Sequence, residues 1–149
     1  MTKNNFEIIY TPIGGAGQIG MNLYLYGYRK PNKEINWLMV DCGIGFADEH
    51  YPGIDIMVPD IDFLQNRNNN LIGIVLTHAH EDHYGAINTL INDKIDVPIF
   101  CTKFTAELLK EKISEDYSDM ILDMKIIKDN AKFDVGEFNV EFINVAHSI

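Results

Sequence analysis

Residues 71–83 are LIGIVLTHAHEDH, and this stretch decides the fold. Its first half, up to Leu76, is a short and continuously apolar run, which is typical of a strand buried on both faces. Its second half is crowded with histidine and acidic side chains, placed where a strand ends and a loop carries functional groups. The stretch therefore predicts a buried strand that leads directly into a metal site.

The segments on both sides of this stretch predict an α/β protein with a mixed sheet. Three strand-like runs come before it and are too closely spaced for crossover helices, so we expect a meander. A polar segment with two prolines, 42–60, predicts a long loop near the site. After it, a helix is expected to start near Tyr84, and Thr102 can cap a second helix with the apolar stripe Phe104, Leu108, Leu109 and Ile113. The expected strands are 6–11, 21–26, 37–40, 71–76, 97–100, 125–127 and 138–145.

Composition limits the class of protein. With 149 residues, of which 46% are hydrophobic, the chain fits one globular domain. Its apolar runs are far shorter than the ~20 residues that span a bilayer, and residues 1–5 lack a signal-type run, so we expect a soluble cytoplasmic protein without a membrane partner. Cys42 and Cys101 form no C-x-x-C pair and are expected to be structural thiols. The net charge of −10 argues against RNA binding by this chain as a whole.

The histidine cluster has the composition of a metal site. His78 and His80 are two residues apart, so their imidazoles point to one side of an extended segment and can share an ion. Asp82 and His83 follow as the chain turns into a helix and can reach a second ion. His147, after the last strand, can supply a third nitrogen to the first ion because strand ends gather at one edge. Nitrogen and oxygen ligands without thiolate fit Zn²⁺, with manganese or iron as substitutes.

Simpler interpretations exist for each of these side chains. The cluster could be a polar turn in which Asp82 caps the following helix. A single histidine at a strand end, such as His147, is weak evidence without its context, and His50 is expected to be a surface residue. Three histidines at this spacing have no reason to occur in a plain turn, so the metal site is the better interpretation.

Five segments carry a resemblance to a known family. Residues 77–86 resemble the H-x-H-x-D-H signature of the metallo-β-lactamase superfamily, in the T-H-G-H-E-D-H-I-G-A form of ribonuclease J. Residues 14–22 resemble the loop G-G-x-x-E-I-G-x-N, and residues 40–43 resemble the first motif of the family. Residues 53–55 together with 58–60 resemble its downstream loop, and residues 147–149 resemble the start of H-S-I-P-D. Gln18 and Ala79 depart from the usual glutamate and glycine.

This resemblance implies a fold, a ligand set and an activity. The fold would be a metallo-β-lactamase-like mixed sheet with flanking helices, an incomplete αββα half, with residues 1–149 as the N-terminal part of that domain and the β-CASP and C-terminal domains absent. His78, His80 and His147 would hold one Zn²⁺, and Asp82 and His83 a second, with Mn²⁺ as a substitute. Asp41 would orient the cluster by hydrogen bonds. Asp82 would also help to orient the attacking water.

The expected function is hydrolysis of RNA phosphodiester bonds by a two-metal site, with exonuclease and endonuclease activity implied by the resemblance. RNA would be the substrate of the full-length protein, which would form homo-oligomers. Because the bridging aspartate and a further histidine are missing, the 149 residues alone are expected to be inactive. Two alternatives stay open: another hydrolase of this superfamily, acting on a small ester or thioester, and a non-catalytic truncated product.

A second motif competes for the glycine-rich segment. Residues 15–20 satisfy G-x-G-x-x-G, and Asp41 follows about twenty residues later, as at a dinucleotide site. The segment after Gly20 alternates like a strand, whereas a dinucleotide site needs a helix there, so a glycine-rich turn is the better interpretation. Tyr24, Tyr26 and Tyr28 could stack on bases, but packing on the sheet is favoured.

Overall fold

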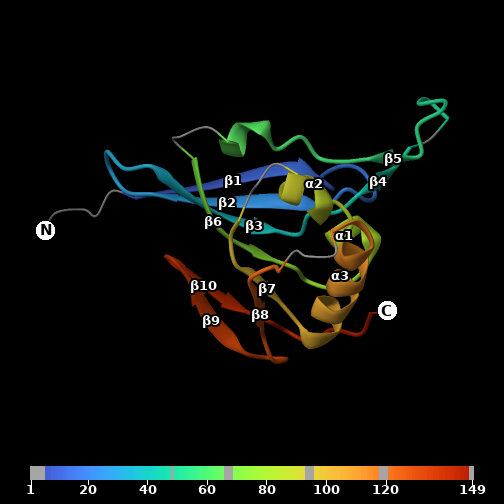
Figure 1. Cartoon of the computed structure of the whole chain (residues 1–149). Coiled ribbons are helices and arrows are strands. Elements are labelled where there is room, and N and C mark those ends of the chain that lie inside the picture. The colour runs from blue at the N-terminus through green and yellow to red at the C-terminus, as the bar shows by residue number, and fades with distance from the viewer. Residues whose placement is uncertain (1–5, 48, 66–68, 93–95, 118–120, 148–149) are drawn as a thin grey trace, which may run out of the picture.

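The computed structural model describes residues 6–47, 49–65, 69–92, 96–117 and 121–147, so residues 1–5 and the end of the last motif, 148–149, lie outside it. A mixed sheet of six strands in the order β1-β2-β3-β6-β7-β8 forms its centre (Figure 1). The first three strands form the antiparallel meander, and the other three run parallel to β3. The predicted mixed sheet is confirmed. The strands are β1 (Glu7–Gly14), β2 (Leu23–Arg29), β3 (Ile35–Val40), β6 (Asn69–Val75), β7 (Ile99–Cys101) and β8 (Met124–Ile126).

The helix expected near Tyr84 is two short helices, α1 (Glu81–Tyr84) and α2 (Ile87–Asn92). The chain breaks between them because the N–H of Ala86 donates to the Cys42 carbonyl, at 2.9 Å, instead of continuing α1. A 3₁₀ turn, η1 (Asp62–Gln65), precedes β6. The sequence gives no local signal for the break, since the partner of Ala86 lies 44 residues earlier.

The third helix, α3 (Lys103–Asp116), has the predicted cap, with Thr102 accepting a hydrogen bond from the Thr105 N–H. The predicted apolar stripe is wrong at its first position, because Phe104 is 54% exposed while Ala106 is fully buried. At about 100° per residue, Phe104 lies on the opposite side of the helix from Ala106. The buried face consists of Thr105, Ala106, Leu109 and Ile113.

Both faces of the sheet are covered, by different elements. Leu25, Met39, Ile74 and Ile99 are paired neighbours on one face and form the main core with the helices. The hairpin of β9 (Lys132–Val135) and β10 (Phe138–Glu141) packs on the other face, as a separate two-stranded sheet in Figure 1. The predicted alternation in β10 is present, since Phe138 and Val140 are half-buried. Strand β9 was not predicted.

Two loops lie at the edge of the sheet next to α1. The long loop after β3 contains a small antiparallel pair, β4 (Gly45–Phe46) and β5 (Ile56–Met57), where the sequence predicted no strand. The glycine-rich segment is a turn in which Gly15, Gly17 and Gly20 have φ of 78°, 84° and 82°, values that favour glycine. Strand β2 follows that turn, so the dinucleotide-site alternative is wrong.

The remaining sequence predictions concern single side chains. Cys42 and Cys101 are both fully buried free thiols, and burial raises the pKa of Cys42 to about 12 and that of Cys101 to about 11. They are therefore structural thiols, as predicted. Tyr24 and Tyr26 pack on Tyr10 of β1. Among the described residues, no helix is long and apolar enough to cross a membrane.

Candidate metal centre

The candidate site lies where two neighbouring parallel strands end. Val40 of β3 pairs with Val75 of β6, so the residues that follow these strands emerge at the same edge of the sheet. Asp41 follows β3 and donates its N–H to the Val75 carbonyl at 2.9 Å. The histidine cluster follows β6 within three residues. The register of the sheet thus brings Asp41 next to Thr77, which lies 36 residues further along the chain and directly before the cluster.

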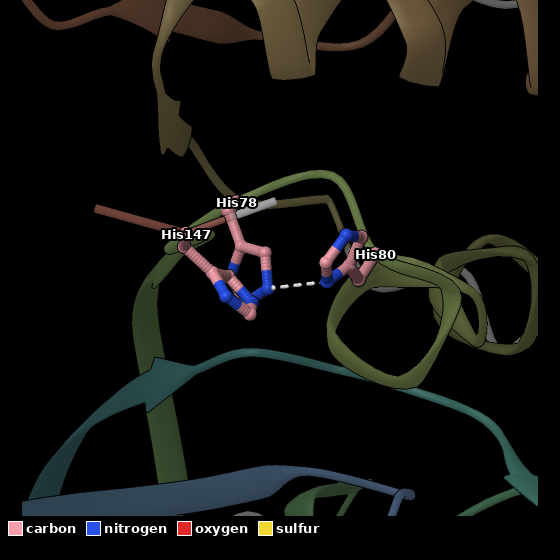
Figure 2. A group of neighbouring side chains, drawn as sticks. All are labelled: His78, His80 and His147. Carbon is pink, nitrogen blue, oxygen red and sulfur yellow. Dashed lines mark hydrogen bonds between the residues drawn. The ribbon is translucent and has the colours of Figure 1, made fainter. Parts of the chain in front are cut away.

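Three histidines from this edge and from the C-terminal segment converge (Figure 2). His78 Nε2 lies 3.0 Å from His80 Nδ1, and the His147 ring centroid is 4.8 Å from that of each of the other two. One nitrogen from each ring can be chosen so that all three lie within 4.8 Å of one another. His78 and His80 are half-buried and His147 is exposed, so the group opens to solvent on one side.

The donor set fits a zinc-like ion. Tetrahedral zinc with Zn–N distances of about 2.05 Å requires ligand nitrogens roughly 3.4 Å apart. The separation between the His78 and His80 nitrogens, 3.0 Å, is near this value, and the His147 nitrogen lies within 4.8 Å of both. Burial lowers the pKa of His78, and the neighbouring His83 and His80 rings lower it further. A neutral imidazole is the form that binds a metal.

A second pair of potential ligands lies beside the three histidines. Asp82 Oδ2 lies 3.5 Å from His83 Nε2, which again matches the spacing of two ligands on one ion. The His83 ring centroid is 4.0 Å from that of His78, so the two groups are adjacent. Asn22 donates from Nδ2 to Asp82 Oδ2 at 3.1 Å, and the same nitrogen lies 3.2 Å from His83 Nε2. The described residues offer this second group two ligand atoms, Asp82 Oδ2 and His83 Nε2.

The buried side chain of Asp41 supports both groups of potential ligands, the three histidines and the Asp82–His83 pair. Its carboxylate, 2% exposed, accepts hydrogen bonds from the N–H and the hydroxyl of Thr77 and lies 2.8 Å from His83 Nδ1. The Thr77 hydroxyl also lies 2.9 Å from His78 Nδ1. With Nδ1 held by Asp41, His83 presents Nε2 to the site.

The charge of Asp41 also affects the protonation of His83. Burial lowers the pKa of His83, but the hydrogen bond to Asp41 and the charges of Asp41 and Asp82 outweigh burial and raise it above 6.5. In the metal-free protein, this ion pair therefore stabilises the fold fully below the ordinary histidine pKa, and the contribution is lost as the pH rises through the raised value. A metal ion bound at His83 Nε2 would displace the proton from that nitrogen.

The backbone of α1 is held by three amides from two loops. The N–H groups of Asn22, Cys42 and Ile44 donate to the carbonyls of Asp82, His83 and Glu81, at 3.0, 2.7 and 3.0 Å. Gly43 lies against the same turn, since a Cβ on it would fall 1.6 Å from the Asp82 oxygen. We refer to these three hydrogen bonds as the α1 cradle. The cradle fixes the turn that carries Asp82 and His83.

Sequence reasoning missed three polar contributors to the site: Asn22, Tyr24 and Thr77. Asn22 is part of the glycine-loop motif, and Tyr24 donates to its Oδ1 at 3.0 Å, which turns the amide nitrogen toward Asp82. Thr77 stands next to His78 in the chain but has no pattern that marks its bond to Asp41. His50 and Gln18 are exposed, and neither belongs to the group of three converging histidines.

Replacing Asp41 by asparagine is expected to weaken zinc binding by roughly 10–100-fold, the cost of losing a partner that orients a metal ligand. Asp41 has φ of 61°, which asparagine tolerates, so the backbone is unaffected. An amide that keeps the Thr77 N–H bond points its NH₂ at His83 Nδ1, which forces the proton onto Nε2. Zinc titration of the purified variant measures the effect.

The matched control is Asp129→Asn, which removes a carboxylate from an exposed turn. It is expected to bind zinc as the wild type does. An Asp41→Asn protein that is folded and binds zinc with wild-type affinity would contradict the role given to this carboxylate.

Comparison with known proteins identifies the class of this fold and site. Residues 36–148 match the family described as beta-lactamase superfamily domain, and the chain belongs to that family. The predicted metallo-β-lactamase-like fold is thereby confirmed. A metallo-beta-lactamase from Pontibacter korlensis aligns with 95% of this chain and 56% of its own, at 18% identity and a TM-score of 0.44.

Relatives with higher sequence identity place the chain more narrowly within this superfamily. Ribonuclease J of Sinorhizobium meliloti is 45% identical over 143 residues, which is 96% of this chain and 25% of the relative. Ribonuclease J 2 of Staphylococcus aureus is 31% identical over 99% of this chain, and ribonuclease J of Helicobacter pylori is 34% identical over 93%. The resemblance to ribonuclease J is confirmed. The chain spans a quarter or less of the length of these relatives.

Proposed function

We propose that the chain supplies the metal-binding part of a ribonuclease that hydrolyses RNA phosphodiester bonds. The observation that carries this proposal is the convergence of His78, His80 and His147 beside Asp82 and His83, in a chain 45% identical to a ribonuclease J. Residues 1–149 are, in this proposal, the N-terminal part of the metallo-β-lactamase domain. In the longer protein, a β-CASP domain and a C-terminal domain would accompany it.

Each residue of the site has a part in the proposed reaction. Zn²⁺, or Mn²⁺ in its place, would supply a lowered pKa of bound water and positive charge beside the phosphoryl oxygens. His78, His80 and His147 would hold one ion, and Asp82 and His83 the other. The Asp82 carboxylate, fixed by Asn22, would accept a hydrogen bond from the attacking water and so orient it toward phosphorus.

RNA binding needs more than this chain. Its net charge of −10 repels a polyanion, so the groove that holds RNA would be built by other parts of the longer protein. An RNA substrate is consistent with a cytoplasmic protein, and homo-oligomers would form through the same additional parts. The direction of cutting, from the 5′ end or internally, also depends on how that groove presents the strand.

The 149 residues alone are expected to bind one metal ion weakly and to cleave little or no RNA. The three histidines complete one set of ligands, whereas the second group offers two ligand atoms, Asp82 Oδ2 and His83 Nε2, among the described residues. A metal titration that finds two tightly bound ions per chain would contradict this expectation.

The test of the proposed function compares RNA with a small thioester. The product of the complete reading frame, loaded with zinc or manganese, is expected to shorten or cut labelled RNA, to lose this activity in a chelator and to regain it when the ion is restored. Gel analysis of the RNA and a colorimetric thiol assay measure the two activities. Turnover of the thioester in preference to RNA would support the other superfamily hydrolase and contradict our proposal.

A further inference from the structure

A cluster of Glu81, Tyr84 and Lys112 joins α1 to α3 beside the candidate metal centre. Lys112 Nζ lies 2.8 Å from Glu81 Oε2 and 5.5 Å from the centroid of the Tyr84 ring. The Lys112 and Glu81 side chains are 25% and 44% exposed, so this ion pair is better shielded from water than the Lys110–Glu107 pair on α3, in which both side chains are more than half exposed.

The position of Glu81 connects this cluster to the metal ligands. Glu81 lies between His80 and Asp82, and α1 has four residues and no side-chain hydrogen bond at its N-cap, His80. A helix of one turn has almost no stability of its own, so its orientation is set by its surroundings. The α1 cradle holds its carbonyls from the side of the sheet. Lys112 holds the Glu81 side chain from the side of α3.

Gly85 lies close to both the backbone and the side chain of Glu81. A Cβ on Gly85 would lie 2.4 Å from the Glu81 carbonyl oxygen and 2.6 Å from Glu81 Oε2, so glycine leaves room for the turn of α1 and for this carboxylate. Tyr84 is 6% exposed, so the Lys112 ammonium lies over a ring that is largely shielded from water.

We propose that Lys112 is a positioning residue of the metal centre, which acts through Glu81 to fix α1 and thus the ligands His80, Asp82 and His83. The proposal rests on the metal centre proposed above. The described contacts of Lys112 are with Glu81 and the Tyr84 ring, and neither is a proposed ligand of the metal. Its effect on metal binding is transmitted by the orientation of a single helical turn.

Cobalt titration of the purified protein tests this role, because Co²⁺ absorption reports both affinity and coordination geometry. Lys112→Met keeps the apolar stem over Tyr84 and removes the charge. We expect it to weaken Co²⁺ binding roughly five- to tenfold and to alter the visible spectrum, less than the loss of a direct partner of a ligand. Lys112→Arg is expected to restore most of the affinity and the spectrum. Lys110→Met, the matched control, is expected to match the wild type.

A second variant separates positioning from a general loss of stability. Glu81→Gln should weaken Co²⁺ binding to a similar extent, and Lys112→Met should add little to it, because both act through one contact. Additive effects of the two changes would overturn the inference, as would a Lys112→Met protein with wild-type affinity and spectrum. A wild type that binds no Co²⁺ would overturn the proposed metal centre itself, and the inference with it.

Discussion

Replacing Gly43 by alanine is expected to lower the free energy of unfolding by about 3 kcal/mol and to abolish metal binding. The new Cβ would fall 1.6 Å from the Asp82 carbonyl oxygen, 2.0 Å from its carbon and 2.6 Å from the His83 nitrogen. None of these is the end of a flexible side chain. The backbone cannot yield cheaply, because the Gly43 N–H donates to Asn22 and the Asn22 N–H donates to Asp82.

Urea denaturation and zinc titration measure the two parts of this result. Gly53→Ala is the matched control, because a Cβ there meets no atom within 4 Å although φ is +83°. That variant should cost about 1 kcal/mol from backbone strain alone and bind zinc normally. If Gly43→Ala were no less stable than Gly53→Ala, the close packing of this loop on α1 would be refuted.

His78→Ala and His80→Ala are each expected to reduce zinc affinity by more than the roughly 100-fold that loss of an orienting partner can cost, because each removes a nitrogen that would bind the ion directly. Their nitrogens are 3.0 Å apart and belong to the three-histidine group of Figure 2. Elemental analysis and zinc titration of the purified proteins measure the loss. The wild type should hold close to one ion per chain at saturating zinc.

The control for these variants is His50→Ala, which removes an exposed histidine from the loop between β4 and β5. It should retain wild-type zinc affinity. Circular dichroism of all four proteins shows whether the fold is kept. Equal zinc affinity in His50→Ala, His78→Ala and the wild type would mean that the histidine cluster is not a metal site.

The parts of the structure that could be predicted from sequence are those with a local cause. The apolar run before the cluster predicts the central strand because burial on both faces leaves no polar position. The helix cap at Thr102 also has a local cause. The prediction for Phe104 was wrong because helical periodicity assigns an apolar residue to a stripe but does not show which side of that stripe faces the sheet.

The parts that could not be predicted depend on pairs far apart in sequence. Thr77 and Asn22 are ordinary polar residues in the sequence, and their roles arise from Asp41 and Asp82, 36 and 60 residues away. The two short helices replace one because Ala86 bonds to Cys42. Strands β4 and β5 are two residues each, too short for alternation to be visible.

The α1 cradle has a consequence for how this site can vary during evolution. Its hydrogen bonds run from main-chain N–H groups to main-chain carbonyls. They therefore do not depend on which side chains stand at Cys42 and Ile44, provided that these side chains fit in the core. One apolar residue can replace another at these two positions while the turn that carries Asp82 and His83 keeps its conformation. Gly43 between them has no such freedom, so we expect neighbouring positions of this one loop to differ sharply in how much variation they tolerate.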